Sequence, residues 1–249
     1  FATAWAGAYR YDGKSLLHLG MAEGLMNNWV NDVAETSDGV IWLATLTGLS
    51  RFNGATVVNY APADGSGGGK VMGLFVDSDD VLWCAAEGLP RFDPKGFIAF
   101  QRRDGFIDRF GRTAGVLALK RDSGRNFWIG TEWAGAFRSD GRRFESIPET
   151  PSTIDQDFVS QIHRAADGTF LWGAYGGLYK HENGRLVGVL DWRNVDALSS
   201  DAQGHLWYGD ANKSGGLSRY NPKTHEETTF TTANGLPDNN VWSIEAASD

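Results

Sequence analysis

Apolar residues recur along the chain in short runs separated by turns of Asp, Gly and Asn. Between residues 30 and 60, a valine-led run is followed by a turn at 37–39 and by a second run, 41–45, that contains a tryptophan. A glycine opens a third run at 48–52, and another turn leads to a weaker run at 57–60. Short β-branched and aromatic runs bounded by turn residues indicate β-strands, and no long window has a helical period. The segment is therefore predicted to form four short strands.

The same pattern occurs five times in full. Each copy opens on a valine and places a tryptophan 12 residues later, or 13 in the fourth copy. The opening residues are Val30, Val71, Val116, Val159 and Val195, and the tryptophans are Trp42, Trp83, Trp128, Trp172 and Trp207. A four-stranded unit repeated every ~40–45 residues is typical of the blades of a β-propeller.

A sixth copy is divided between the two ends of the sequence. Residues 241–249 match the start of a repeat, and residues 1–14 match 129–142 almost position for position. We therefore expect an internal piece of a longer protein, with an all-β fold: a single β-propeller domain or sector over 1–249, with six repeat units visible. Complete blades are expected near 30–70, 71–115, 116–158, 159–194 and 195–240, and the split blade comprises 241–249 plus 1–29. In a six-bladed ring, a strand at 241–246 would pair with the N-terminal strands; in a larger ring the chain would be an open sector.

Three residues of the repeat have expected structural roles. The tryptophan offers a large apolar plate to the neighbouring blade, since a buried indole removes ~150–250 Å² from water. The Asp before it accepts hydrogen bonds from backbone N–H groups in the turn between the first two strands. A basic residue recurs three positions after the glycine of the third strand, which favours a structural role such as a stem laid across a sheet edge. These basic residues are Arg10, Arg51, Arg91, Arg138, Lys180 and Arg219.

Composition and charge narrow the classes of function. The net charge of −8 argues against binding to nucleic acid or to anionic membranes. No stretch approaches the ~18 apolar residues of a membrane span. The single Cys84 excludes an intramolecular disulfide, and the five histidines lack metal-ligand spacing, so neither a metal nor another cofactor is predicted. The chain starts Phe-Ala-Thr and shows no targeting signal.

Several motifs resemble the two-component regulator propeller repeat. They are the turn and strand 201–207, the run 216–221 and the segment 234–241, which looks like the family's lead-in to a new blade. The resemblance covers essentially the whole chain. It implies an extracytoplasmic, periplasmic sensor region ahead of a histidine kinase, a diguanylate cyclase or a DNA-binding output, and a homodimer through the parent receptor. In gut-type hybrid sensors such propellers accompany recognition of glycan fragments.

Residues that depart from the repeat are better binding candidates than residues that obey it. Propeller ligands are expected where the loops before the first strand meet the loops between the second and third strands. Aromatic and polar side chains in these loops suit a sugar, whose C–H faces stack on rings and whose hydroxyls take hydrogen bonds. For Trp5 and Trp133, which occupy equivalent positions, packing is the alternative role. The candidate ligand-binding residues are Trp5, Arg109, Glu132, Trp133, Asp157, Tyr175, Trp192, Arg193, Asp210 and Asn212.

The sequence thus favours a non-catalytic sensor module that binds a small molecule or an oligosaccharide. No catalytic constellation is visible, so an enzyme is not the first choice. A polysaccharide lyase or glycoside hydrolase is the first alternative, because carboxylates from different blades could converge in the folded chain. A protein-interaction scaffold is the second, and it would present a broad flat surface instead of a pocket.

Overall fold

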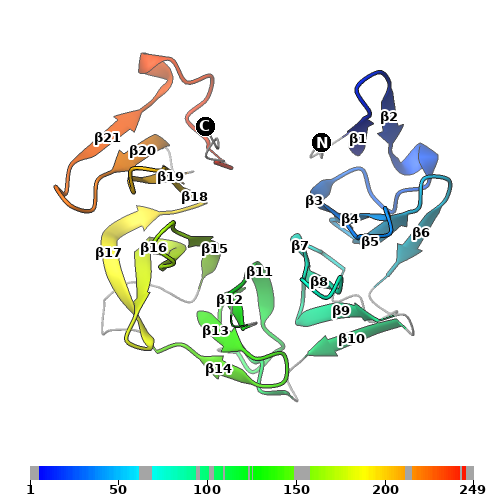
Figure 1. Cartoon of the computed structure of the whole chain (residues 1–249), viewed down its shortest axis with the longest axis horizontal. Helices are drawn as coiled ribbons and strands as arrows, with labels where there is room; N and C mark the ends of the chain where they lie inside the picture. Colours follow the sequence, from blue (N-terminus) through cyan, green and yellow to red (C-terminus); the bar gives the residue numbers. More distant parts are fainter. Residues whose placement is uncertain are drawn as a thin grey trace. The chain divides into compact units, whose positions relative to one another are not determined.

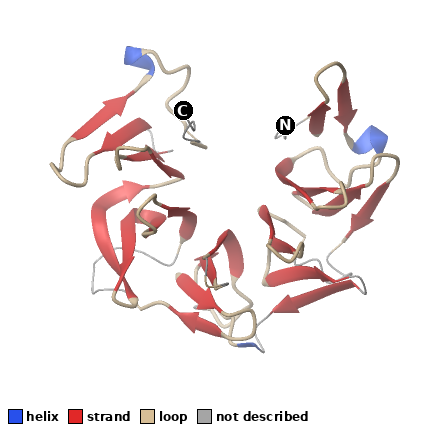
Figure 2. Cartoon of the chain, in the orientation of Figure 1, coloured by secondary structure: helices blue, strands red, loops and turns tan. Residues whose placement is uncertain are grey.

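The computed structural model describes most of the chain. The described residues are 6–61, 69–93, 96–100, 104–108, 110–122, 124, 126–148, 158–210, 215–241 and 243–244. Contacts between Cα atoms divide the chain into two compact units, Phe1–Arg125 with Arg142–Phe144, and Asn126–Gly141 with Glu145–Asp249. The boundary falls inside the repeat predicted at 116–158. Strands dominate both units (Figure 2).

The first unit contains two complete four-stranded antiparallel sheets and a hairpin (Figure 1). The hairpin is β1 (Ala8–Tyr11) with β2 (Leu16–Leu19), and the 3-10 helix η1 (Met21–Glu23) follows it. One sheet has the order β3-β4-β5-β6, and the other has the order β10-β9-β8-β7. Their strands are β3 (Val30–Glu35), β4 (Ile41–Thr45), β5 (Gly48–Phe52), β6 (Val57–Tyr60), β7 (Gly73–Val76), β8 (Leu82–Ala85), β9 (Leu89–Asp93) and β10 (Gly96–Phe100). Strand β11 (Gly115–Arg121) completes this unit, and β14 (Phe144–Ser146) lies across the boundary.

The second unit begins with the antiparallel pair β12 (Phe127–Glu132) and β13 (Ala136–Ser139). A three-stranded sheet follows, formed by β15 (Val159–Arg164), β16 (Phe170–Glu182) and β17 (Arg185–Asn194). It has three elements because β16 runs through the residues of both the second and the third predicted strands. The last sheet, in the order β18-β19-β20-β21, comprises β18 (Ala197–Ser200), β19 (Leu206–Asp210), β20 (Gly216–Tyr220) and β21 (Glu227–Phe230), and the 3-10 helix η4 (Thr232–Asn234) follows.

The strands occur where the apolar pattern predicts them, and the opening valines link successive repeats. Val71 N–H donates to Thr45 O at 3.1 Å in the first unit. Val195 N–H donates to Ala174 O at 3.4 Å in the second. These bonds join the start of one repeat to the end of the second strand of the repeat before it. The described C-terminal residues Val241, Ser243 and Ile244 are outside any strand, and the other residues of 241–246 lie outside the described part, so ring closure stays a prediction.

The glycine before the third strand is required by close packing. A Cβ atom at Gly88 would overlap the carbonyl oxygen of Phe100, and one at Gly216 would overlap that of Phe230. Their φ angles of 80° and 113° also lie in the region that favours glycine. The fourth strand can therefore lie close to the start of the third only where this position has no side chain.

Apolar side chains fill the space between neighbouring sheets within each unit. In the first unit, Trp42 packs with Leu82 and Cys84 of the next repeat, and its ring centroid lies 4.7 Å from that of Phe92. Cys84 is fully buried, and burial raises the pKa of its thiol to about 12. Cys84 therefore packs as a small hydrophobic side chain. In the second unit, Leu171 packs with Leu198 and Tyr208 in the same way.

The recurrent basic residue lies over the recurrent tryptophan. The guanidinium carbons of Arg51, Arg91, Arg138 and Arg219 lie 5.7–5.9 Å from the centroids of the rings of Trp42, Trp83, Trp128 and Trp207. Each arginine is the cross-strand partner of its tryptophan, as in the pair Trp42 and Arg51. The structural role predicted for the basic residues is thus confirmed for these four arginines. Each makes a cation–π contact with the indole of the tryptophan in its own sheet.

Trp172 departs from the other four repeat tryptophans. Trp42 lies opposite Ala34 on the first strand, and the residue at the matching place in the fourth repeat is Leu171, opposite His163. Because side chains alternate between faces along a strand, one extra residue turns Trp172 to the other face of its sheet. There its ring lies 5.9 Å from that of Trp128 in the preceding repeat. The prediction that all five tryptophans are one position repeated is therefore wrong for Trp172.

Candidate functional site

The structure describes the side chains of three of the ten predicted site residues: Glu132, Trp133 and Tyr175. Trp5, Arg109, Asp157 and Asn212 lie outside the described residues. Trp192 and Arg193 are on β17 and Asp210 is on β19, but their side chains are outside the described part. The site is therefore built from the three described residues and their neighbours, all in the second unit.

Trp133 is presented by a tight turn between β12 and β13. The N–H and the hydroxyl of Thr131 both donate to the carbonyl oxygen of Gly135, at 3.0 and 2.6 Å. The turn gives Trp133 a φ of 68°, a conformation that costs a bulky residue free energy and is rare for it. Glu132 ends β12 immediately before this turn, so its carboxylate belongs to the same loop. A strained backbone at an aromatic residue is a pattern found at ligand-binding positions.

Three aromatic rings from two neighbouring repeats form a continuous row. The ring of Trp133 lies edge-to-face with that of Phe158, with centroids 6.1 Å apart and planes at 73°. The ring of Phe158 stands in the same way against Tyr175, at 5.8 Å and 72°. The backbone supports this arrangement, since Tyr175 N–H donates to Phe158 O at 2.9 Å. We call Trp133, Phe158 and Tyr175 the aromatic row.

The aromatic row is open to solvent. Tyr175 keeps 52% of its surface exposed, and Trp133 and Phe158 are half-buried. Packing and ligand binding, the two roles left open for Trp133, are therefore compatible: the indole contacts Phe158 while the residue keeps part of its surface accessible. Edge-to-face contacts of this kind hold rings in fixed orientations and leave ring surface free for a ligand.

Phe158 was not among the predicted site residues. It directly precedes the opening valine of its repeat, as Trp29 precedes Val30, and the two positions make the same contact. Leu46 N–H donates to Trp29 O at 3.1 Å, as Tyr175 N–H does to Phe158 O. An aromatic residue one position before the opening valine is therefore the sequence feature that could have indicated Phe158.

A metal site would need several ligating side chains grouped within the part of the chain that the structure describes. There, no three His, Cys, Asp or Glu side chains are grouped so that they could hold a metal ion. Asp77, in the turn that superficially resembles a calcium loop, instead accepts the N–H groups of Asp79 and Val81 and forms a buried ion pair with Arg121 at 2.8 Å. No described helix is both long enough and apolar enough to cross a membrane.

Comparison with known families supports the predicted resemblance. Residues 24–47 match the family described as the two-component regulator propeller. The match begins after η1 and includes β3, the turn and β4, which are the first two strands of a repeat. No curated protein matches the chain.

Solved structures match nearly the whole chain at low sequence identity. The extracellular domain of BT4673, named as a one-component system of B. thetaiotaomicron, is 20% identical with a TM-score of 0.76, over 98% of this chain and 33% of that one. That of BT3049, named as a hybrid two-component system of the same organism, is 22% identical with a TM-score of 0.69, over 85% of this chain and 31% of that one. Virginiamycin B lyase from Staphylococcus aureus is 15% identical with a TM-score of 0.65, over 88% and 75%.

These similarities confirm the fold. The chain is an all-β protein with the blade architecture of a β-propeller, and it spans about a third of the length of the two extracellular domains it matches. At these identities the neighbours establish architecture, and function must be argued from the site.

Proposed function

We propose that this chain is a ligand-sensing propeller module of a bacterial signalling receptor, exposed outside the cytoplasm, and that it binds an oligosaccharide at the aromatic row. The family match at 24–47 and the extracellular domains of similar fold support the sensor part of the proposal. The observation that supports oligosaccharide binding is the aromatic row, in which three rings from two repeats are open to solvent. Transmission of the signal through a dimer of the parent receptor belongs to the same proposal.

The chemistry of the aromatic row suits a sugar ring. The axial C–H groups of a hexose stack on an aromatic face, and hydroxyls at its rim take hydrogen bonds from neighbouring polar groups. Glu132 adjoins Trp133 in the chain and would accept such bonds, and the Tyr175 hydroxyl would donate one. Rings held in place before binding lose little conformational entropy when the ligand arrives. No specific contact among the described residues favours either alternative, an enzyme or an interaction scaffold.

The proposal is tested by calorimetry of the purified chain against a panel of oligosaccharides from each major glycan class. Tyr175→Ala removes the most exposed ring of the row and should weaken binding about tenfold, the loss expected for one stacking contact. Tyr11→Ala is the matched control, since Tyr11 is 59% exposed and belongs to the first unit. Absence of binding to every glycan class, or equal affinities for Tyr175→Ala and the unmodified chain, would contradict the proposal.

A further inference from the structure

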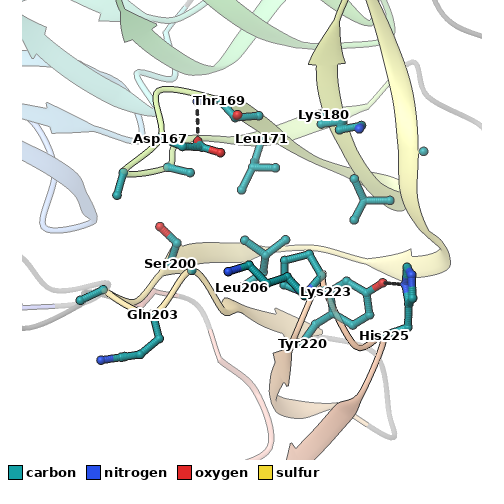
Figure 3. A pocket seen from close by; sticks show the side chains of 17 residues that line it. Asp167, Thr169, Leu171, Lys180, Ser200, Gln203, Leu206, Tyr220, Lys223 and His225 are labelled. Atoms are coloured by element: carbon teal, nitrogen blue, oxygen red, sulfur yellow. Dashed lines mark hydrogen bonds between the residues drawn. The ribbon is translucent and has the colours of Figure 1, made fainter.

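A second concave feature lies between the sheets β15-β16-β17 and β18-β19-β20-β21, both in the second unit. It is a cleft of about 600 Å³, within the size range of small-molecule sites. Figure 3 shows Leu171 on one wall, and Leu206 and Tyr220 on the facing wall. All three belong to the buried core between these two sheets, so the floor of the cleft is apolar.

The cleft is separate from the aromatic row. In the pair β15 and β16, Val159 lies opposite Ala174 at one end and Arg164 lies opposite Phe170 at the other. The aromatic row is at the first end, since Phe158 and Tyr175 adjoin Val159 and Ala174. The turn 165–169, which lines the cleft, is at the second end. A ligand in the cleft would therefore occupy a different end of the blades from a sugar on the row.

Aromatic rings fill the corresponding space at the junction between the first two complete repeats. The ring centroid of Trp42 lies 4.7 Å from that of Phe92 and 5.9 Å from that of Tyr60. The ring centroid of Phe97 lies 5.3 Å from those of both Tyr60 and Phe92. These four rings pack with Leu82 in the core between the sheets β3-β4-β5-β6 and β10-β9-β8-β7.

The matching positions at the cleft hold a single aromatic ring. In strand register, the positions of Trp42, Tyr60, Phe92 and Phe97 are taken by Leu171, Leu190, Tyr220 and Glu227. Only Tyr220 is aromatic, and the residue that turns Trp172 to the other face of its sheet is the reason why Leu171 stands at the first position. The cleft therefore coincides with volume that aromatic rings fill at the first junction.

The polar side chains around this floor are largely bonded to protein partners. The bonded pairs are the Tyr220 hydroxyl with Nδ1 of His225 at 2.7 Å, the Ser200 hydroxyl with Nε2 of His163 at 2.8 Å, and the Lys180 ammonium with the Glu182 carboxylate at 3.1 Å. Because these groups have partners already, the apolar floor is the surface that a ligand can bury with most gain.

Asp167 sets the charge at the wall of the cleft. Its Oδ1 accepts the N–H of Thr169 at 2.8 Å, and this bond, together with one from the Thr169 side chain, holds the pKa of Asp167 below its usual value. The carboxyl is therefore ionised at neutral pH. A negative charge at this wall repels an anion and does not repel an uncharged molecule.

We propose that this cleft is a second ligand site and that it binds a small uncharged aromatic molecule, of the size of indole or a phenol. The ring of the ligand lies between Leu171 and Tyr220, in the place that the Trp42 ring has beside Phe92 at the first junction. Contact with the Tyr220 ring favours an aromatic ligand over a saturated one of the same size, since paired rings gain more than their buried area alone provides.

The test titrates the whole chain, isotope-labelled for amide NMR, with indole and 4-methylphenol, and with cyclohexanol and benzoate as comparisons. Both uncharged aromatic compounds should bind and shift the amides of Leu171, Leu206 and Tyr220. Cyclohexanol should bind about threefold to tenfold more weakly, because its saturated ring lacks the ring–ring contact. Benzoate should also bind at least about threefold more weakly, because Asp167 repels its charge.

Two substitutions of one residue test the origin of the cleft. Leu171→Trp places an indole at the position of Trp42, fills the volume and should abolish binding of free indole. Leu171→Ala is the matched control, since it changes the same residue without filling the cleft, and it should still bind indole. The location of the shifts in the unmodified chain decides the proposal even if Leu171→Trp does not fold.

Four results would overturn the proposal. One is that neither indole nor 4-methylphenol shifts the amides of the cleft. Another is that cyclohexanol or benzoate binds as tightly as 4-methylphenol. A third is that a folded Leu171→Trp binds indole as well as Leu171→Ala does. The last is that indole shifts the amides of Trp133 and Tyr175 instead, which would assign it to the aromatic row.

Discussion

The indole N–H of Trp207 donates to Oδ2 of Asp201 at 2.9 Å, and Trp83 makes the same bond to Asp77, also at 2.9 Å. In both repeats the aspartate stands six residues before the tryptophan and also accepts the N–H groups of its own turn. In these two repeats the turn and the repeat tryptophan therefore form one hydrogen-bonded unit. In the first complete repeat, Thr36 occupies the aspartate position, and the buried Nε1 of Trp42 has no hydrogen-bond partner among the described residues.

This difference predicts unequal costs for the same substitution. Trp83→Phe removes a bond to a buried carboxylate, whereas Trp42→Phe removes a donor that is already unsatisfied. The loss of ring volume is common to both. Trp83→Phe should therefore lower the free energy of unfolding by about 1–2 kcal/mol more than Trp42→Phe, measured by urea denaturation. Equal costs would show that the aspartate bond contributes nothing to stability.

The buried carboxyl of Asp32 should make the stability of the fold depend on pH. Burial raises the pKa of this carboxyl above its usual value, although the N–H groups of Leu74 and Val33 and the charge of Lys120 act in the opposite direction. A raised pKa in the folded state means that the contribution of Asp32 to stability is lost as the pH rises through that value. Asp32→Asn should therefore be more stable than the unmodified chain near neutral pH. The difference should vanish as the pH falls below 3.8, the ordinary value.

Asp38→Asn is the control of opposite sign. Hydrogen bonds from Thr36 and from the N–H of Val40 lower the pKa of Asp38. Its contribution to stability is therefore present above the ordinary value and lost as the pH falls, so Asp38→Asn should be destabilising near neutral pH. Urea denaturation of both variants between pH 3 and pH 7.5 checks the two signs. Parallel pH profiles for the two variants would contradict the assignment.

Trp133 has a strained backbone conformation and a partly exposed side chain. Two substitutions separate the effect of the backbone from the loss of the side chain. Both Trp133→Gly and Trp133→Ala remove the contact with Phe158, but only glycine adopts a φ of 68° without steric cost. The glycine variant should therefore be more stable than the alanine variant by about 1 kcal/mol, measured by thermal or urea unfolding. If alanine were the more stable of the two, the turn in solution would not hold this residue in the left-handed region.

Much of the fold could be predicted from the sequence because similar turn and strand residues recur in every repeat. The opening valine, the Asp turn and the glycine before the third strand recur at nearly constant spacing, and this spacing is enough to place the strands. The contact of Arg51 with Trp42 could not be predicted, because it depends on the register between two strands. The face of Trp172 was predicted wrongly for the same reason, since one added residue changes a strand's register without changing its composition.

The site was harder to predict than the fold because its parts come from different repeats. Glu132, Trp133 and Tyr175 were identified by their departure from the repeat, and the structure joins Trp133 to Tyr175 through Phe158. Phe158 was missed because an apolar residue beside an opening valine has the composition of a core position. The cleft between the sheets β15-β16-β17 and β18-β19-β20-β21 could not be predicted either, since residues such as Leu171 and Tyr220 line it only because two sheets pack together.

Because Trp172 lies on the other face of its sheet, the fourth repeat cannot simply be exchanged for another repeat of the chain. At the junction between the third and fourth repeats, the indoles of Trp128 and Trp172 meet edge to face, so this junction is filled by a matched pair of large rings. A copy of another repeat inserted in the fourth place would therefore leave Trp128 facing a smaller side chain and an unfilled volume. The fourth blade therefore shares the pattern of the others but is not interchangeable with them, because Trp172 fits it to the third blade.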